Sequence, residues 1–349
     1  DEANYYFIES LKLKPSTDKF FPSTQVHAKI ALTQMNMGKN DQALETLNME
    51  LTHCIREKDK LGLATIYIYK GLVHLDKDEI EPAKINFNEG VEWANQTGNK
   101  HLQAIALGNI GLIYEKEGDF ENAFIHYQRD LEICKELDDK QGTSISLCLI
   151  GQLLNLKGEF MEAISHLQKA LAISEMLGFQ KGMAKALNTL GDVYYFKNEY
   201  ERSIHFYERA IKLTRRINNK LVLGYSLIEL AIVFLVNGQF SKVEELLIEA
   251  SSISKELSND TFKFDIKLLE AKYTRANGEK IQAAEILVQM ENMTCTQEQE
   301  AERLFEWVML FPNESALREN AIHKYTSLLE MTPKYIYKER LRILNLYLN

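Results

Sequence analysis

The hydrophobic positions of this chain follow the spacing of an amphipathic helix, and the whole pattern returns at a constant interval. In the clearest segment the apolar stripe runs through Leu107, Gly111 and Tyr114, with steps of four and three residues. Such steps keep side chains on one face of a helix, whereas a strand alternates at every second residue. The interval from Gly71 to Gly111 is 40 residues, and it recurs along the chain. The small residues in this register, here called anchors, are Ala31, Gly71, Gly111, Gly151, Gly191, Ala231 and Ala271.

Each anchored segment predicts two helices joined by a tight turn. Seven residues after the anchors, for example at Gly118 and Gly158, stand residues that suit a helix end with positive φ. Twelve and sixteen residues after an anchor come a small and then a large side chain, as in Ala123 and Tyr127, on one face of the second helix. A two-helix hairpin is too thin to bury both of its apolar faces, so neighbouring hairpins must stack. The pattern therefore predicts an all-α solenoid of antiparallel helix hairpins.

Three short motifs connect this pattern to a known family. They are Gly111-x-x-Tyr114, Gly118-x-Phe120 and Ala123-x-x-x-Tyr127. Together they resemble the tetratricopeptide repeat, in an interval longer than the family's usual length of about 34 residues. The longer form is similar to the repeats of kinesin light chains, spindle-orientation adaptors and bacterial peptide-pheromone receptors. The resemblance implies a right-handed superhelix whose first helices line a concave groove for a peptide or a helical segment of a partner.

The repeats are expected to cover residues 23–295, with seven units. Residues 1–22 read as the second helix of a truncated upstream repeat plus a linker, because Ala3 and Phe7 fall in register with the small and large columns. We therefore expect the array to continue upstream of Asp1.

Residues 296–349 depart from the repeat and are expected to form atypical capping helices, as solenoids require at an exposed apolar end. One helix is expected over residues 315–331, and Pro333 breaks it. The last helix is expected over residues 335–348, with Lys338, Arg342 and Asn345 facing outward.

The resemblance places the positions six and three before each anchor, and one and four after it, in the groove, beside the column two before the anchor. The candidate partner-binding residues are Tyr69, Asn109, Glu115, Gln152, Asn155, Lys185, Asn188, Asp192, Tyr195, Tyr225 and Glu229. Amides can both donate to and accept from a peptide backbone, and tyrosines supply contact area with a polar tip. The alternative is that these positions are polar only because the concave face is in contact with water.

Composition narrows the function further. The formal net charge of −9 argues against a nucleic-acid partner, which requires a basic surface. No apolar stretch is long enough for a membrane span, and the first residues lack the features of a signal peptide, so we expect a cytoplasmic protein. The cysteines form no metal-binding spacing and the common catalytic motifs are absent, so no catalytic residue, metal or cofactor is expected.

We therefore predict a non-catalytic scaffold that binds a protein or peptide in its groove. An alternative is the sensor arm of a larger bacterial signalling protein (a transcription regulator, cyclase or kinase) with a covalently linked effector domain. The absence of an initiator Met and the half-repeat at residues 1–15 favour that alternative. A peptide-pheromone receptor acting alone is a weaker hypothesis, because the receptors of this kind carry an additional N-terminal segment. The sequence leaves the partner and the oligomeric state open.

Overall fold

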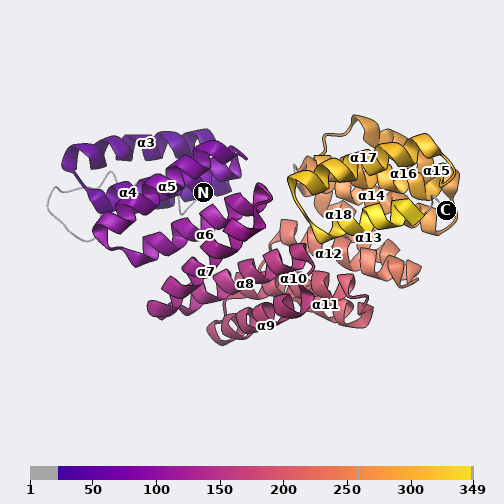
Figure 1. Cartoon of the computed structure of the whole chain (residues 1–349), viewed down its shortest axis with the longest axis horizontal. Helices are drawn as coiled ribbons and strands as arrows, with labels where there is room; N and C mark the ends of the chain where they lie inside the picture. Colours follow the sequence, from indigo (N-terminus) through magenta and orange to yellow (C-terminus); the bar gives the residue numbers. More distant parts are fainter. Residues whose placement is uncertain (1–22, 258, 347–349) are drawn as a thin grey trace. The chain divides into compact units, whose positions relative to one another are not determined.

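The computed structural model describes residues 23–257 and 259–346, and every regular element in these ranges is a helix (Figure 1). The elements are α2 (Ser23–Asn36), α3 (Asn40–Glu57), α4 (Lys60–Asp76), α5 (Ile80–Thr97), α6 (Lys100–Lys116), α7 (Phe120–Glu136), α8 (Lys140–Lys157), α9 (Phe160–Leu177), α10 (Gln180–Phe196), α11 (Tyr200–Arg216), α12 (Lys220–Val236), α13 (Phe240–Glu256), α14 (Asp260–Ala276), α15 (Lys280–Gln289), the short 3-10 helix η1 (Met290–Asn292), α16 (Gln297–Leu310), α17 (Ser315–Met331) and α18 (Tyr335–Leu346). The expected upstream half-repeat with Ala3 and Phe7 lies outside the described residues.

The chain divides into two compact units, residues 1–146 and 147–349, and the division falls inside α8. In unit 1, α2 packs on α3, α4 on α5 and α6 on α7, and neighbouring hairpins also touch. In unit 2 the same pairing joins α10 to α11, α12 to α13, α14 to α15 and α16 to α17. The predicted fold class, an all-α solenoid of antiparallel helix hairpins, is confirmed.

The turn inside each hairpin ends on a left-handed residue, as predicted. At Gly118, with a φ of 81°, the N–H donates to the carbonyl of Glu115 at 3.1 Å. The next N–H, of Asp119, donates to the carbonyl of Tyr114 at 2.9 Å, which closes the first helix with the hydrogen bonds typical of a Schellman motif. The residues with positive φ in this column are Gly38, Asp78, Gly118, Gly158, Asn198, Gly238 and Gly278.

A second left-handed column ends the second helices and was not predicted. It consists of Lys58, Gly98, Asp138, Gly178 and Asn218, whose φ values lie between 51° and 66°. At several of these turns the next residue caps the following helix. Asp59 and Asn99, for example, accept hydrogen bonds from the N–H groups of Gly62 and Leu102 at 2.9 and 3.0 Å. From α2 to α15, only two or three residues therefore separate consecutive helices.

The anchor glycines mark where the two helices of a hairpin meet. A Cβ atom placed on Gly111 would lie 2.6 Å from the ring of Tyr127, and one on Gly191 would lie 2.7 Å from the ring of Tyr207. Both tyrosine side chains are fully buried. The large residue sixteen positions after the anchor therefore packs directly on the anchor, and a side chain at that position would displace it.

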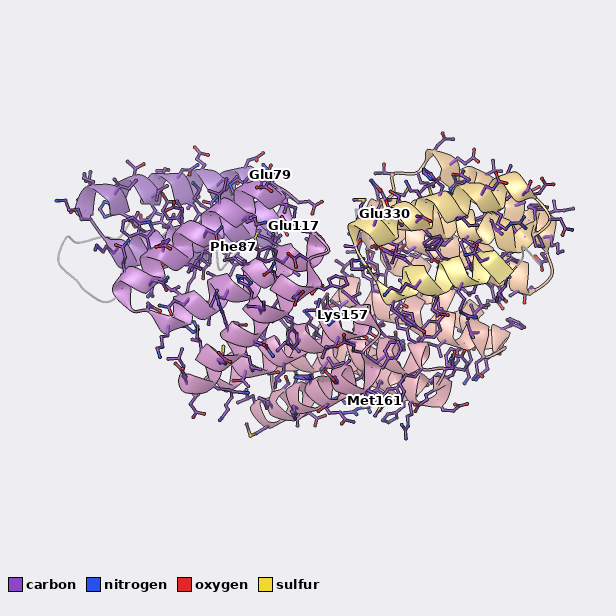
Figure 2. The ribbon with its side chains drawn as sticks, viewed as in Figure 1. Glu79, Phe87, Glu117, Lys157, Met161 and Glu330 are labelled. Atoms are coloured by element: carbon purple, nitrogen blue, oxygen red, sulfur yellow. The ribbon has the colours of Figure 1, made fainter. Side chains whose placement is uncertain are left out.

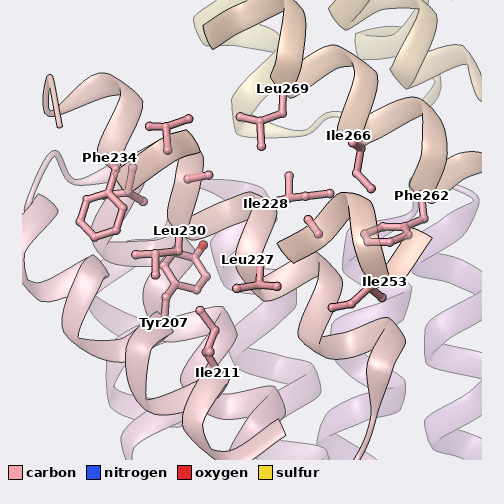
Figure 3. Packing of buried hydrophobic residues seen from close by; sticks show 14 residues of the cluster. Tyr207, Ile211, Leu227, Ile228, Leu230, Phe234, Ile253, Phe262, Ile266 and Leu269 are labelled. Carbon is pink, nitrogen blue, oxygen red and sulfur yellow. The ribbon is translucent and has the colours of Figure 1, made fainter. Parts of the chain in front are cut away.

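The core is a series of clusters that link one hairpin to the next. In unit 2 one cluster extends from Tyr207 and Ile211 of α11 through Leu227 and Leu230 of α12 to Phe262 of α14 (Figure 3). Unit 1 holds two such clusters along its own hairpins. The stacked arrangement explains why each repeat depends on its neighbours for burial.

Ion pairs bridge successive hairpins at the surface. Glu79 and Glu117, labelled in Figure 2, lie in the turns that follow α4 and α6. Lys84 of α5 lies 2.8 Å from the carboxylate of Glu117, and Lys116 lies 2.9 Å from that of Asp78. Such exposed pairs contribute little individually and are screened by salt.

The C-terminal helices lie outside the regular repeat. Thr296 and Gln299 form a capping box at the start of α16, and α17 has the predicted bounds. In α18, Lys338, Arg342 and Asn345 are exposed as predicted. The predicted end of this helix at residue 348 falls outside the described residues.

Candidate functional site

Unit 2 contains a cavity of about 520 Å³ on the inner side of its first helices. The lining comes from α10, α12 and α14, from α16 and α17, and from α18. Its apolar part includes Ile228, Ile232, Leu268, Phe305 and Ile343. A volume of this size and a mostly apolar lining with a few polar groups are typical of binding sites.

Three of the predicted partner-binding residues line this cavity. They are Tyr195 of α10 and Tyr225 and Glu229 of α12. The Tyr225 ring packs edge-on against Phe262, with ring centroids 5.1 Å apart, and Tyr195 packs in the same way against Phe196. Rigid aromatic side chains with a polar tip therefore form one wall of the cavity.

Glu302 of α16 is the centre of a charged network in the cavity wall. Its carboxylate accepts hydrogen bonds from Arg340 Nε and Nη2 at 2.7 and 2.9 Å and from Lys272 Nζ at 3.1 Å. Tyr325 donates a further hydrogen bond at 2.7 Å. Burial opposes ionisation, but the charges of Arg340 and Lys272 outweigh it and hold the pKa of Glu302 well below its usual range. Glu302 is therefore a carboxylate at neutral pH.

Arg275 of the lining and Lys334 beside it are also paired with carboxylates. Arg275 Nε lies 2.8 Å from the carboxylate of Glu306, whose side chain is buried. Lys334 and Tyr337 both donate to Glu298. The cations around the cavity thus form ion pairs with carboxylates of α16.

Three further carboxylates near the cavity have no cation in hydrogen-bonding contact among the residues that the structure describes. Burial, followed by the like charges of Asp192 and Asp265, raises the pKa of Glu229. Burial raises the pKa of Asp265 to about 6, although Gln299 Nε2 donates to it at 2.7 Å. Asp192 accepts a hydrogen bond from Tyr207, and burial raises its pKa as well. At this end of the cavity, burial therefore favours the protonated form of these carboxyl groups.

Helix α18 forms the opposite wall. Ile336, Tyr337, Arg340 and Ile343 line the cavity from this helix. At its first residue, Tyr335 packs against the rings of Phe160 and Phe196, with centroids 5.0 and 5.9 Å away.

The remaining predicted residues lie elsewhere or use their polar groups internally. In unit 1, Asn109 donates to the carbonyl of Ile105 at 2.7 Å, and the buried Glu115 accepts from Tyr127 at 2.9 Å. Tyr69, in the same unit, is half-buried.

In unit 2, Asn188 accepts a hydrogen bond from Ser226 at 2.9 Å. Asn155 is buried, and its Oδ1 atom has no hydrogen-bond partner among the described residues. Lys185 is exposed and Gln152 is half-buried. As partner contacts, all of the predicted residues remain predictions, including the three that line the cavity.

The positions expected to line the groove, counted from the anchors, also identify cavity residues that were not among the candidates. For the anchor Ala271, the positions six and three before and one and four after are Asp265, Leu268, Lys272 and Arg275, and all four line the cavity. They were missed because the repeat signature weakens in this segment. Glu302 and Arg340, outside the repeats, carried no signal in the sequence.

The described residues include no cluster of metal ligands and no thiol with a lowered pKa. No group of three or more His, Cys, Asp or Glu side chains in that part of the chain could hold a metal ion. Burial raises the pKa of Cys134 to about 12 and that of Cys148 to about 11, which makes both thiols poor nucleophiles. None of the described helices is long and apolar enough to cross a membrane.

Comparison with known proteins agrees with this architecture. Residues 102–176 and 184–216 match sequence models of the tetratricopeptide repeat. No curated protein sequence is similar enough to the chain to count as a match.

Several solved structures are similar to this chain over nearly its whole length. A Rap protein complexed with competence and sporulation factor is 13% identical, with a TM-score of 0.64, over 99% of this chain and 91% of that chain. The apo form of the quorum sensor NprR from B. thuringiensis is 15% identical, with a TM-score of 0.61, over 100% and 93%. A signal transduction ATPase with a tetratricopeptide repeat sensor from Pyrococcus horikoshii is 13% identical, with a TM-score of 0.61, over 96% and 46%. At these identities the likeness establishes the fold.

Proposed function

This chain is a tetratricopeptide-repeat protein, and we propose that it is a non-catalytic cytoplasmic scaffold that binds a peptide or a helical segment of a partner in the groove of unit 2. The observation that carries the proposal is the cavity lined by Tyr195, Tyr225 and Glu229. It combines aromatic walls with a half-buried carboxylate that a ligand could contact.

The proposal extends to the class of the ligand. The Rap protein described above was solved with a bound factor, and NprR is a quorum sensor. A receptor for a signalling factor therefore falls within the proposed function. The alignment of this chain with 91% of the Rap chain supports this extension.

A test uses a phage-displayed library of random peptides selected against the full chain. Selected peptides are then titrated against a Tyr195→Phe/Glu229→Gln variant, which removes a hydroxyl group, replaces a carboxyl group with a neutral amide and keeps the shape of the cavity. We expect affinity to fall at least tenfold, while a Lys212→Ala variant, changed at an exposed position of α11, binds normally. Equal binding by both variants would refute the proposed site.

A second candidate is the sensor arm of a larger signalling protein. The similarity to the Pyrococcus horikoshii ATPase favours this role. That protein has a tetratricopeptide repeat sensor, and 96% of this chain aligns with only 46% of it. The full reading frame decides whether an effector domain is attached. If one is, a peptide selected as above should change the activity of that domain, and an unchanged activity would exclude this role.

A further inference from the structure

We propose that α18 occupies the groove of unit 2 as an intramolecular ligand, and that the groove takes a partner helix with the same inner face: apolar and aromatic residues around a central arginine. This inference rests on the proposed function and specifies its partner.

The residues of α18 that face the groove have the spacing of a helix-in-groove ligand. Ile336, Tyr337, Arg340, Ile343 and Leu344 recur at steps of one, three, three and one residues, which keeps them on one face. Tyr337 and Leu344 are buried. Recognition of this kind reads anchors at such positions on an amphipathic helix, whereas an extended segment would present every second residue.

The contacts of α18 go beyond those of a capping helix. A cap has to cover the apolar face of the last hairpin, and α18 does so by packing on α17. Tyr335, however, also lies on the turn between α8 and α9 and on the end of α10. A Cβ atom placed on Gly158 would lie 2.7 Å from the Tyr335 ring, so the glycine leaves the space that this ring fills. Covering the last hairpin requires no contact with helices so far back in the chain.

Arg340 provides the polar centre of the interface. Its guanidinium forms two hydrogen bonds with Glu302 and lies 4.3 Å from the centroid of the Phe305 ring. Planar guanidinium groups are well suited to such paired and stacked contacts. Without α18, the groove would present the buried Glu302 carboxylate with Lys272 as its one hydrogen-bonded cation, so its charge favours an arginine-bearing partner.

The fit of α18 is incomplete. The 520 Å³ cavity remains between α18 and the first helices, with the Glu229 carboxylate on its wall. An occupant that leaves this volume unfilled forgoes part of the available packing. A partner helix with bulkier side chains toward Glu229 therefore has contacts to gain when it replaces α18.

The test locks α18 in place and releases it in the same protein. In a Gly158→Cys/Tyr335→Cys variant of the full chain, the ideal Cβ position at residue 158 lies 3.3 Å from Cβ of residue 335, close to the separation in a disulfide. The probe is a fluorescein-labelled peptide of residues 333–346, stapled between its outward positions 338 and 342 to hold it helical. Helical circular dichroism of both redox forms, with mass spectrometry of the new disulfide, verifies folding and bond formation.

We expect the reduced variant to bind the probe at least tenfold more tightly than the oxidised variant, with the wild type between them. A probe carrying Arg340→Ala should lose at least tenfold in affinity for the reduced variant. An Arg342→Ala chain, changed on the outward face of α18, should bind like the wild type. Equal binding by the two redox forms, failure of the probe to bind either, or indifference to Arg340→Ala in the probe would overturn the inference.

The two proposals fail in different ways. Library peptides that depend on Tyr195 and Glu229 but bind the locked and released forms equally would leave the proposed function standing and refute the role of α18. If the stapled probe competes with none of the groove-dependent library peptides, the inference is likewise wrong.

Discussion

Ser146 donates a hydrogen bond of 2.7 Å to the carboxylate of Asp130, and the two side chains join α8 to α7 inside unit 1. Cys134 donates a weaker one at 3.4 Å. Neither donor is charged, so burial dominates and raises the pKa of Asp130 to about 6. The folded protein thus binds a proton at this site over a range in which the unfolded chain has already released it.

Asp130 should make the stability of the protein depend on pH. Because its folded pKa lies above its unfolded value, stability is full below about pH 4 and falls as the pH rises to about 6, by up to roughly 3 kcal/mol. An Asp130→Asn variant should lose this dependence. Urea unfolding of both proteins at about pH 4.5 and about pH 7.5, near the ends of that window, measures this change in stability. The same change in unfolding free energy between the two pH values in both proteins would contradict the assignment.

Replacing an anchor glycine should destabilise the fold although alanine favours helices. In Gly191→Ala the new Cβ would lie 2.7 Å from the buried Tyr207 ring, so overpacking of about 1–3 kcal/mol should exceed the gain in helix propensity of about 1 kcal/mol. Chemical denaturation measures the net loss. The control is Gly38→Asn, at a positive φ with open space around it, where Asn is tolerated as it is at Asn198. A Gly191→Ala protein more stable than the wild type would show that the tyrosine moves freely.

Breaking the central ion pair of the cavity should cost more than breaking a surface pair. Arg340→Ala leaves the largely buried Glu302 with Lys272 as its one cation, and we expect a loss of about 3 kcal/mol. Arg342→Ala removes an exposed pair with Glu339 and should change stability by less than about 1 kcal/mol. Thermal unfolding followed by circular dichroism compares the two, and equal shifts in Tm would argue against a network centred on Glu302.

Glu229→Gln should stabilise the protein while weakening ligand binding. Burial and the neighbouring carboxylates raise the pKa of Glu229, so its ionised form is unfavourable in the folded state, and its contribution to stability is lost as the pH rises through that pKa. The neutral amide removes this penalty. The stability gain should therefore be larger at pH 8, at about the raised pKa, than at pH 5, which is about the pKa of an ordinary glutamate. Calorimetry at both pH values measures the difference. A variant less stable than the wild type at pH 8 would mean that the carboxylate has a favourable partner.

The repeat could be predicted in detail because its signals are local. Glycines such as Gly118 and Gly158 mark helix ends that depend on a few neighbouring residues. The second turn was harder, since its column mixes residue types and includes Lys58, which rarely adopts a positive φ. There the capping side chain that follows, such as Asp59, fixes the helix start instead.

The candidate site was predictable only where it follows the repeat. Tyr195, Tyr225 and Glu229 could be selected because the groove columns recur at fixed distances from the anchors. Contacts between segments far apart in the chain have no such register. The pairing of Arg340 with Glu302, and the position of Tyr335 on Gly158, depend on how α18 returns across unit 2, which no local pattern encodes.

The two left-handed columns of the repeat have a consequence for how such a chain can change in length. Each turn has only two or three residues between its helices and can absorb little change in register. One residue inserted in a helix would rotate every later side chain of that helix by about 100° and move its apolar stripe off the neighbouring hairpin. Duplication or deletion of one whole period, as from Gly71 to Gly111, keeps both columns and all packing faces aligned. The protein can therefore be lengthened or shortened by complete repeats, and engineered variants should be cut at that interval.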